Sequence, residues 1–181
     1  MKEFELQKKY NWELANQPII ASNHYLGEEY LGGIIFNLYT GSDGQQHGHV
    51  ISIAEITDAW SNTTSTTGAN RSWDSEYNMN LMIDSPVKTW IQSLGTGWYL
   101  PSSDLCRLIS INKYYINQTL FNIGETNFIG NGDDLNPSYY WTSLEYNFER
   151  AWGYEMDREF LGSNFFKDNN TLVKARAVKS F

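Results

Sequence analysis

Two apolar runs on either side of a turn-rich segment constrain the fold more than any other feature of the sequence. Within YLGGIIFNLYTGSDGQQHGHVISIAE, the first run extends from Ile34 to Tyr39 and the second from His49 to Ile53. The intervening SDGQQHG supplies the Ser, Asp and Gly residues that chain reversals require. β-forming runs bounded by such residues predict a β-hairpin at these positions.

Two helices are predicted in the middle of the chain. In DSPVKTWIQSLG, Pro86 occupies the first helical position behind a capping residue, Asp84 or Ser85. The apolar residues of this helix share one face: Val87, Trp90, Ile91 and Leu94. The stretch GWYLPSSDL joins an extended piece to a second helix, which we expect from Ser102 to about Tyr115.

Three strands are predicted in the last third of the chain, in YYWTSLEY, AWGYEMD and LVKARAVKSF. Apolar and polar residues alternate in the middle strand, so Trp152 is expected to face the core and Glu155 the solvent. The core residues expected in this part of the chain are Trp141, Trp152, Met156, Val178 and Phe181.

The order of these elements indicates the fold class. A hairpin, two helices and then a small antiparallel sheet are typical of an α+β fold, not of a parallel α/β sheet. Long loops separate the elements, as in the stretch rich in Ser, Thr and Asn at 61–78. A chain of 181 residues is most simply one domain. We place that domain at 26–181, behind an N-terminal extension or arm at 1–25.

Several motifs follow one another over residues 30–181, namely GGIIF with DGQQHGHVIS, GWYLPSSDLCRLI, YYWTSLEYNFERAWGYEM and ARAVKSF. In this order they resemble the bacterial "domain of unknown function 1566" family. The resemblance implies a C-type-lectin-like fold, in which two helices pack on small antiparallel sheets with long loops. It also implies a structural role for Trp98, Leu100 and Pro101 beneath the sheet.

The sequence departs from the family pattern at Ala175 and Lys179 of the closing motif, which does not threaten the fold. The calcium signature of sugar-binding C-type lectins, Glu-Pro-Asn or Gln-Pro-Asp with a later Trp-Asn-Asp, is missing, so the resemblance implies calcium-independent binding. Members of the family occur in surface, adhesin-like and phage-associated proteins of gut bacteria. The implied location is therefore the cell surface, the extracellular space or a virion.

Composition and charge narrow the class of ligand. A net charge of −8 argues against nucleic acid and anionic membrane surfaces, since both require a basic footprint. Charged residues make up 19% of the chain and aromatic residues 15%, a balance that suits recognition through large, rigid side chains. No run approaches the length of a membrane span. The expected partner is a glycan or another protein.

The ligand-binding residues are assigned through the resemblance. In related lectin-like proteins, the solvent side of the C-terminal sheet and its loops present the ligand surface, and some relatives diversify it by retroelement mutagenesis. Carried onto this sequence, that surface comprises Tyr146, Asn147, Glu149, Arg150, Gly153, Glu155, Asp157 and Arg158, with Asn164 and Lys167 as extensions. Each residue alone can be a solvated residue between core residues, but the mixture favours a recognition surface.

Two groups of residues raise the question of a metal site. The loop GNGDDLNPS contains the oxygen donors Asp133, Asp134 and Asn136. These donors can hold Ca²⁺, but Asp and Asn beside Gly and Pro are ordinary turn residues, and we favour the turn. His47 and His49 can share one face of a strand, yet neither they nor His24 have a third ligand nearby in the sequence. We predict no metal and no cofactor.

Catalysis is not expected. The chain has no G-x-S-x-G motif and no marked Ser, His and acid set. Cys106 is the only cysteine, so an intrachain disulfide cannot form. The two-thiol chemistry of formylglycine-generating enzymes, which share this fold superclass, is excluded for the same reason. We expect Cys106 to be a core or half-buried residue.

Two functions of different classes follow. The first is a non-catalytic, lectin-like or adhesin-like module that recognises a glycan or protein on a cell surface. The alternative is a structural or assembly component of a pilus, surface fibre or phage tail, joined into a homo-oligomer or larger assembly through residues 1–25. The N-terminal sequence shows no apolar segment of a signal peptide. Either the protein is not secreted by the usual route, or a signal has been removed.

Overall fold

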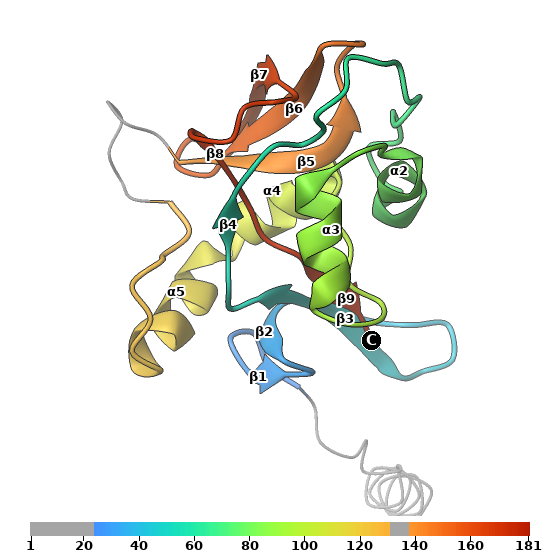
Figure 1. Ribbon diagram of the computed structural model, residues 1–181. Coiled ribbons are helices and arrows are strands. Elements are labelled where there is room, and N and C mark those ends of the chain that lie inside the picture. The colour runs from blue at the N-terminus through green and yellow to red at the C-terminus, as the bar shows by residue number, and fades with distance from the viewer. Residues whose placement is uncertain (1–23, 131–137) are drawn as a thin grey trace, which may run out of the picture.

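The computed structural model describes residues 24–130 and 138–181 (Figure 1). The described helices are α2 (Ser75–Leu81), α3 (Pro86–Ser93), α4 (Ser103–Ile111) and α5 (Lys113–Asn122). The strands of the first half are β1 (Glu29–Tyr30), β2 (Gly33–Thr40), β3 (Gln46–Ser52) and β4 (Ile56–Thr57). Those of the second half are β5 (Tyr139–Glu145), β6 (Arg150–Glu155), β7 (Phe160–Phe166), β8 (Val173–Ala175) and β9 (Val178–Ser180). The fold is α+β, as the sequence predicts.

Sheet A has the strand order β1-β2-β3-β9 and is antiparallel throughout. Its centre is the predicted hairpin, in which β2 and β3 pair from Gly33 opposite Ser52 to Thr40 opposite Gln46. Gly33 must be a glycine, because a Cβ there would lie 2.5 Å from the carbonyl oxygen of Ile51. The sequence prediction of the hairpin is confirmed.

Sheet B has the strand order β4-β8-β5-β6-β7. Strands β5 and β8 are parallel, and the other pairs are antiparallel. The predicted strand LVKARAVKSF is divided between the two sheets, because β8 joins sheet B and β9 joins sheet A (Figure 1). The strand β7 was not predicted, since the sequence pattern around Phe160–Phe166 lacks a strict alternation.

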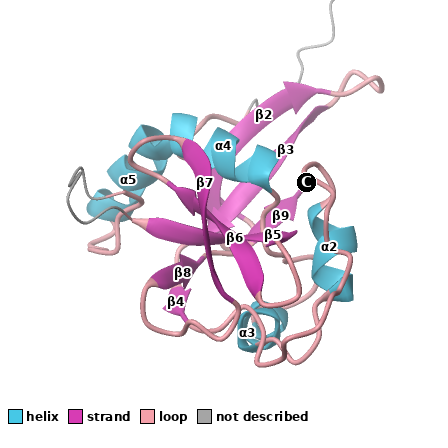
Figure 2. Cartoon of the chain, turned by 90° about the horizontal axis from the view of Figure 1, so that it is seen from above, coloured by secondary structure: helices cyan, strands magenta, loops and turns pink. Residues whose placement is uncertain are grey.

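Helix α4 lies between the sheets and contacts both β2 and β5 (Figures 1 and 2). Its buried residues include Cys106 and Ile109, which face the core. The predicted second helix is in fact two helices, because α4 ends at Ile111 and α5 begins at Lys113, with Asn112 as the cap between them. The predicted first helix is confirmed as α3, where the Ser85 hydroxyl accepts a hydrogen bond from the Lys88 N–H at 3.1 Å.

The joint GWYLPSSDL connects the two sheets to α4. Tyr99 forms an isolated bridge with Val178 of β9, and the Pro101 carbonyl accepts a hydrogen bond from the Ser143 N–H of β5 at 2.8 Å. Leu100 is fully buried in the core between these contacts. The segment is therefore fixed on both sides before the helix begins.

A buried arginine holds the crossing from β8 to β9. The Arg176 Nε donates to a carboxylate oxygen of Glu55 at 3.1 Å, and its Nη1 donates to the carbonyls of Ser52 and Ile53. Its Nη2 donates to the carbonyl of Asn127. One guanidinium thus satisfies carbonyls from two separate loops, a task suited to its fixed set of five donors.

The orientation of β6 differs from the prediction. Trp141, Met156 and Val178 are buried as expected, and Phe181 packs partly buried against the core. Trp152 is only half-buried and lies outside the core, so its assignment to the core is wrong. Glu155, expected at the solvent face, is buried.

The reason is the packing of small residues in β6. Ala151 and Gly153 face inward and make room for the Phe165 ring, since a Cβ at Gly153 would lie 2.7 Å from that ring. Tyr154 and Met156, which alternate with Gly153 and Glu155, are buried as well, so this end of the strand is covered on both faces and Trp152 alone stays half-buried.

Candidate ligand-binding surface

Five side chains form an exposed to half-buried cluster on strands β6 and β7 and the turn before them. We call this set the arginine–aromatic cluster: Tyr146, Arg150, Trp152, Asn164 and Phe166. The antiparallel register places Arg150 opposite Phe166 and Trp152 opposite Asn164. Because directly opposed residues share one face of a sheet, these four side chains lie together.

The rings and the guanidinium of the cluster contact one another. The rings of Tyr146 and Trp152 meet edge to face, with centroids 4.8 Å apart and planes at 82°. The Arg150 Cζ lies 4.0 Å from the centroid of the Phe166 ring. Tyr146 remains 49% exposed and Phe166 51% exposed. These contacts order the cluster while large parts of its rings stay available to a ligand.

The Asn164 side chain and backbone fix the guanidinium. The Arg150 Nη1 donates to both the carbonyl oxygen and the Oδ1 of Asn164, at 3.2 Å each. Within the described residues, the Nε and Nη2 of Arg150 make no hydrogen bond. The geometry therefore leaves N–H donors for a carboxylate or hydroxyl of a ligand.

The turn that presents the cluster is built by Asn147. Its Oδ1 accepts hydrogen bonds from the N–H groups of Glu149 and Arg150, at 2.9 and 2.8 Å. The Tyr146 N–H closes the turn by donating to the Arg150 carbonyl at 2.9 Å. Asn147, predicted to bind ligand, thus positions Tyr146 and Arg150 through the backbone, as Asn commonly does in turns.

A buried ion pair lies beside the cluster. The Lys167 Nζ is 2.5 Å from the Glu145 Oε1 and also donates to the Ser65 carbonyl at 2.7 Å. The Glu145 carboxylate accepts the N–H groups of Thr67 and Gly68. Burial acts to raise the pKa of Glu145, but these hydrogen bonds outweigh it and lower the pKa below its usual value. Lys167 is therefore an anchor for the loop that follows β4, and its predicted place on an accessible surface is wrong.

The other predicted residues lie at the far end of β6. Gly153 and Glu155 are buried, and the Arg158 Nε lies 3.3 Å from the Glu155 Oε1. The Asp157 Oδ2 accepts a hydrogen bond from the Ser138 N–H at 2.9 Å. Strands rise about 3.3 Å per residue, so the length of β6 separates this end from Arg150. The structure brings together only Tyr146, Asn147, Glu149 and Arg150 of the eight predicted residues.

Two members of the cluster, Trp152 and Phe166, were missed by sequence reasoning. Trp152 was assigned to the core, and Phe166 lay in a segment where no strand was predicted. Recognising FLGSNFF as a strand would have placed Phe166 on the opposite face from Phe165, which packs against the core.

The histidines have polar partners outside this cluster. His24 Nδ1 lies 3.0 Å from Glu28 Oε2, and His47 Nε2 lies 3.0 Å from Asp43 Oδ2. The Asn37 Nδ2 and the His49 Nδ1 form a hydrogen bond of 3.0 Å, and burial lowers the pKa of the His49 ring. In the parts of the chain that the structure covers, no three His, Cys, Asp or Glu residues group as metal ligands. The loop residues Asp133, Asp134 and Asn136 lie outside the described residues.

The single cysteine is a core residue, in agreement with the sequence prediction. Cys106 is fully buried in α4, and burial strongly raises the pKa of its thiol. A thiol in this environment stays protonated near neutral pH, and the protonated form is a poor nucleophile.

Comparison with family models and with curated proteins finds no match for this chain. Among the described residues, every helix is too short or too polar to traverse a lipid bilayer.

Proposed function

We propose that this chain is a non-catalytic recognition module that binds a glycan or protein on a cell surface. The observation that carries the proposal is the arginine–aromatic cluster, in which Arg150 stacks on Phe166 beside the Tyr146–Trp152 pair. Tyr, Trp and Arg are the residue types most enriched at the energetic centres of interfaces. Because these side chains are already held in place before a ligand arrives, binding costs less side-chain conformational entropy.

The proposal extends to the fold family and the location. A C-type-lectin-like domain of the bacterial "domain of unknown function 1566" family is supported by the order of the sequence motifs. The long hairpin joined to the late strand β9, with α4 between two sheets, is compatible with it. A location on a cell surface, outside the cell or on a virion follows from the same resemblance.

The charges of the cluster favour ligands with acceptor groups. Arg150 offers the free N–H donors described above, while exposed rings offer apolar contact. A protein carboxylate or a ring of sugar hydroxyls satisfies such donors. The module needs no resident metal for this mode of binding, because the donors and rings belong to side chains of the chain itself.

Two phenylalanines of β7 provide a matched test. Phe166 belongs to the cluster and Phe160 lies at the far end of the strand, and the two are 51% and 55% exposed. The labelled full chain is applied to a glycan array and to an array of cell-surface proteins, with and without EDTA. We expect Phe166→Ala and Arg150→Ala to weaken binding roughly tenfold or more, and Phe160→Ala and EDTA to leave it unchanged.

The thermal midpoint of each variant serves as the control for folding. If Phe160→Ala lost binding while Phe166→Ala still bound, the binding site would lie at the end of β6 near Asp157 instead. Absence of any bound glycan or protein, or equal binding by all variants, would refute the proposal.

A further inference from the structure

The Arg150 guanidinium is held in place by neutral groups only. Its Nη1 donates to the carbonyl and the Oδ1 of Asn164, and its Cζ lies 4.0 Å from the centroid of the Phe166 ring. Neither of these residues carries a negative charge. In the described parts of the chain, no carboxylate forms an ion pair with Arg150, not even that of the preceding residue, Glu149.

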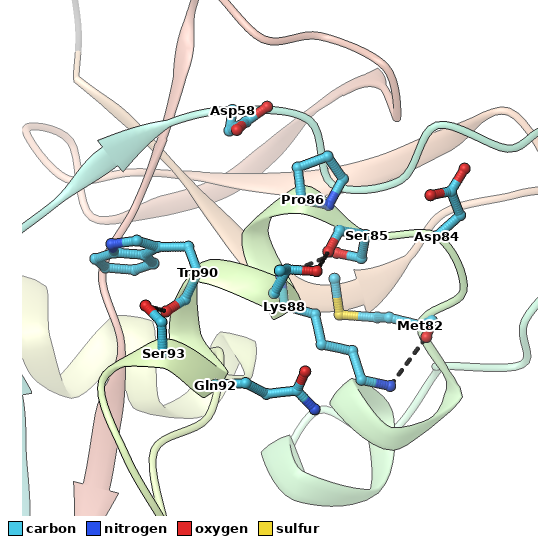
Figure 3. A pocket seen from close by; sticks show the side chains of 10 residues that line it. Asp58, Met82, Asp84, Ser85, Pro86, Lys88, Trp90, Gln92 and Ser93 are labelled. Carbon is cyan, nitrogen blue, oxygen red and sulfur yellow. Dashed lines mark hydrogen bonds between the residues drawn. The ribbon is translucent and has the colours of Figure 1, made fainter.

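This arrangement differs from that of most other basic side chains in the described ranges. Those that form ion pairs with carboxylates are Arg71, Lys113, Arg158, Lys167, Lys174 and Arg176. Lys88 instead uses its ammonium group to donate to the carbonyls of Asn80 and Met82, in the pocket along α3 (Figure 3). The chain has 21 acidic and 13 basic residues, so carboxylates are abundant. Arg150 is nevertheless ordered without a counter-ion, which leaves its charge for a ligand.

The unused edge of the guanidinium has the geometry of a carboxylate. Nη1 is occupied by Asn164, whereas Nε and Nη2 make no hydrogen bond among the described residues. The N–H bonds of Nε and Nη2 on this edge are parallel, and they match the two oxygens of one carboxylate. A single hydroxyl uses only one of these two donors.

Aromatic rings lie directly beside the guanidinium. Arg150 and Trp152 are two residues apart on β6, which places them on one face about 7 Å from each other. Asn164, which holds Nη1, lies opposite Trp152 in the register, and the Tyr146 ring meets the Trp152 ring. In an acidic sugar, the carboxylate is bonded to the sugar ring itself. A ligand of this kind that binds Arg150 therefore brings its ring to the Tyr146–Trp152 pair, where C–H groups can contact aromatic surface.

The backbone of β7 disfavours an acidic peptide in the same place. β7 is the edge strand of sheet B, and an extended peptide binds such an edge through main-chain hydrogen bonds. The Asn164 carbonyl already accepts the Arg150 Nη1, and the Phe166 carbonyl accepts the Asn169 N–H at 3.0 Å. The cluster therefore offers side chains to a ligand and withholds two of the backbone acceptors that an added strand would need.

We propose that the arginine–aromatic cluster selects saccharides that carry a carboxylate, such as uronic and sialic acids. The carboxylate binds Nε and Nη2 of Arg150, and the sugar ring contacts Tyr146 and Trp152. The net charge of −8 repels densely charged polyanions, so the ligand carries isolated carboxylates. This inference rests on the proposed function and deepens it, because it names the chemical class of ligand for the same site.

The test compares acids with their uncharged counterparts. The full chain, labelled with ¹⁵N, is titrated with methyl β-glucuronide and its primary amide, and with 3′-sialyllactose and lactose. The readouts are the Trp152 indole N–H signal, assigned with Trp152→Phe, and the Arg150 Nε–H signal, assigned with Arg150→Lys. We expect at least one acid to shift both signals, and its uncharged counterpart to bind at least roughly tenfold more weakly.

Two arginines provide a matched pair of variants. Arg150→Lys keeps the positive charge but loses the planar pair of donors, so it should weaken binding of the acid by roughly tenfold. Arg71 also stacks on a ring, with its Cζ 3.4 Å from the Tyr77 centroid, but it is already paired with Asp74. Arg71→Lys should therefore bind the acid as the wild type does.

An isosteric change supplies the missing counter-ion. Asn164→Asp places a carboxylate where Oδ1 now lies, 3.2 Å from the Arg150 Nη1. We expect binding of the acid to fall by roughly tenfold or more, while the thermal midpoint stays equal or rises. An unchanged affinity in this variant would show that the charge of Arg150 does not select the ligand.

The remaining outcomes separate this inference from the proposed function. Equal binding of acids and uncharged counterparts, or stronger shifts of the two signals by a peptide of alternating glycine and glutamate, would overturn the inference. Binding of neutral glycans alone, lost in Phe166→Ala, would do the same but leave the proposed function standing. Absence of any bound glycan or protein would overturn both.

Discussion

Lys167 and Glu145 form an ion pair inside the protein, with side chains only 1% and 6% exposed and 2.5 Å between Nζ and Oε1. The pair joins the end of β7 to β5 and holds Ser65, Thr67 and Gly68 through backbone hydrogen bonds. A loop rich in Ser, Thr and Asn, which has little apolar surface of its own, is thereby attached to sheet B.

Removing one partner of this pair should strongly destabilise the fold. Lys167→Met leaves the Glu145 carboxylate buried without its cation, and we expect a loss of about 3–5 kcal/mol in the free energy of unfolding, measured with urea. The control is Arg71→Met, which breaks the solvent-exposed pair with Asp74 and should cost far less than Lys167→Met. Similar losses in the two variants would contradict the role of Lys167 as an anchor.

The Glu145 carboxylate should also make the free energy of unfolding depend on pH in the acidic range. The pKa of Glu145 is lowered in the folded protein, so the folded state binds fewer protons than the unfolded chain, where the pKa is about 4.3. Its contribution to stability is complete above that value and is lost as the pH falls through the lower folded pKa. We expect the unfolding free energy to decrease from about pH 5 downward, with a shallower decrease in Glu145→Gln. Identical pH profiles would argue against this source of acid sensitivity.

Two neighbouring glycines should differ in their tolerance of a methyl group. At Gly33, the new Cβ would lie 2.5 Å from a backbone oxygen of Ile51 and 3.0 Å from the Trp98 ring. We expect Gly33→Ala to cost about 3 kcal/mol or more, since the backbone oxygen cannot move aside. Gly32 has open space around it but a φ of +82°, so Gly32→Ala should cost about 1–2 kcal/mol. Thermal unfolding of both variants gives the comparison, and a reversed order would contradict the register of the hairpin.

The two tryptophans of the central strands test the orientation of β6. Trp141 is fully buried, and its Nε1 donates to the Asp58 carbonyl at 2.9 Å. Trp141→Ala should therefore cost about 3–5 kcal/mol. Trp152→Ala should cost about 1–2 kcal/mol, because only part of its ring is buried. Urea denaturation measures the loss of unfolding free energy in each variant. An equal loss in the two variants would show that Trp152 belongs to the core after all.

Local patterns predicted the elements that are defined by local chemistry. The hairpin follows from two β-forming runs and a turn, and α3 follows from Ser85, Pro86 and a regular apolar face. The division of the last predicted strand between two sheets could not be predicted, because it depends on the buried guanidinium of Arg176 and its partners far away in the sequence. Local spacing carries no information about such contacts.

The candidate surface was predicted in part for a similar reason. The turn at Asn147 is a local feature, and the residues beside it, Tyr146 and Arg150, are indeed accessible. Ala151 and Gly153 pack beside the Phe165 ring of another strand while Trp152 stays half-buried, and the local pattern does not show this neighbour. The burial of Glu155 and Lys167 likewise depends on neighbours that are distant in the sequence. Their charge predicted an exposed position, and this prediction was wrong.

Strand β9 pairs with β3, although it is the last of the described strands along the chain. While the protein is being synthesised, β3 leaves the ribosome well before β9, and the N–H and C=O groups along one of its edges then have no strand to pair with. An open edge of this kind is a template for pairing with another chain. Newly made molecules are therefore exposed to aggregation until Val178–Ser180 have emerged, and slow elongation or crowded polysomes should increase that risk.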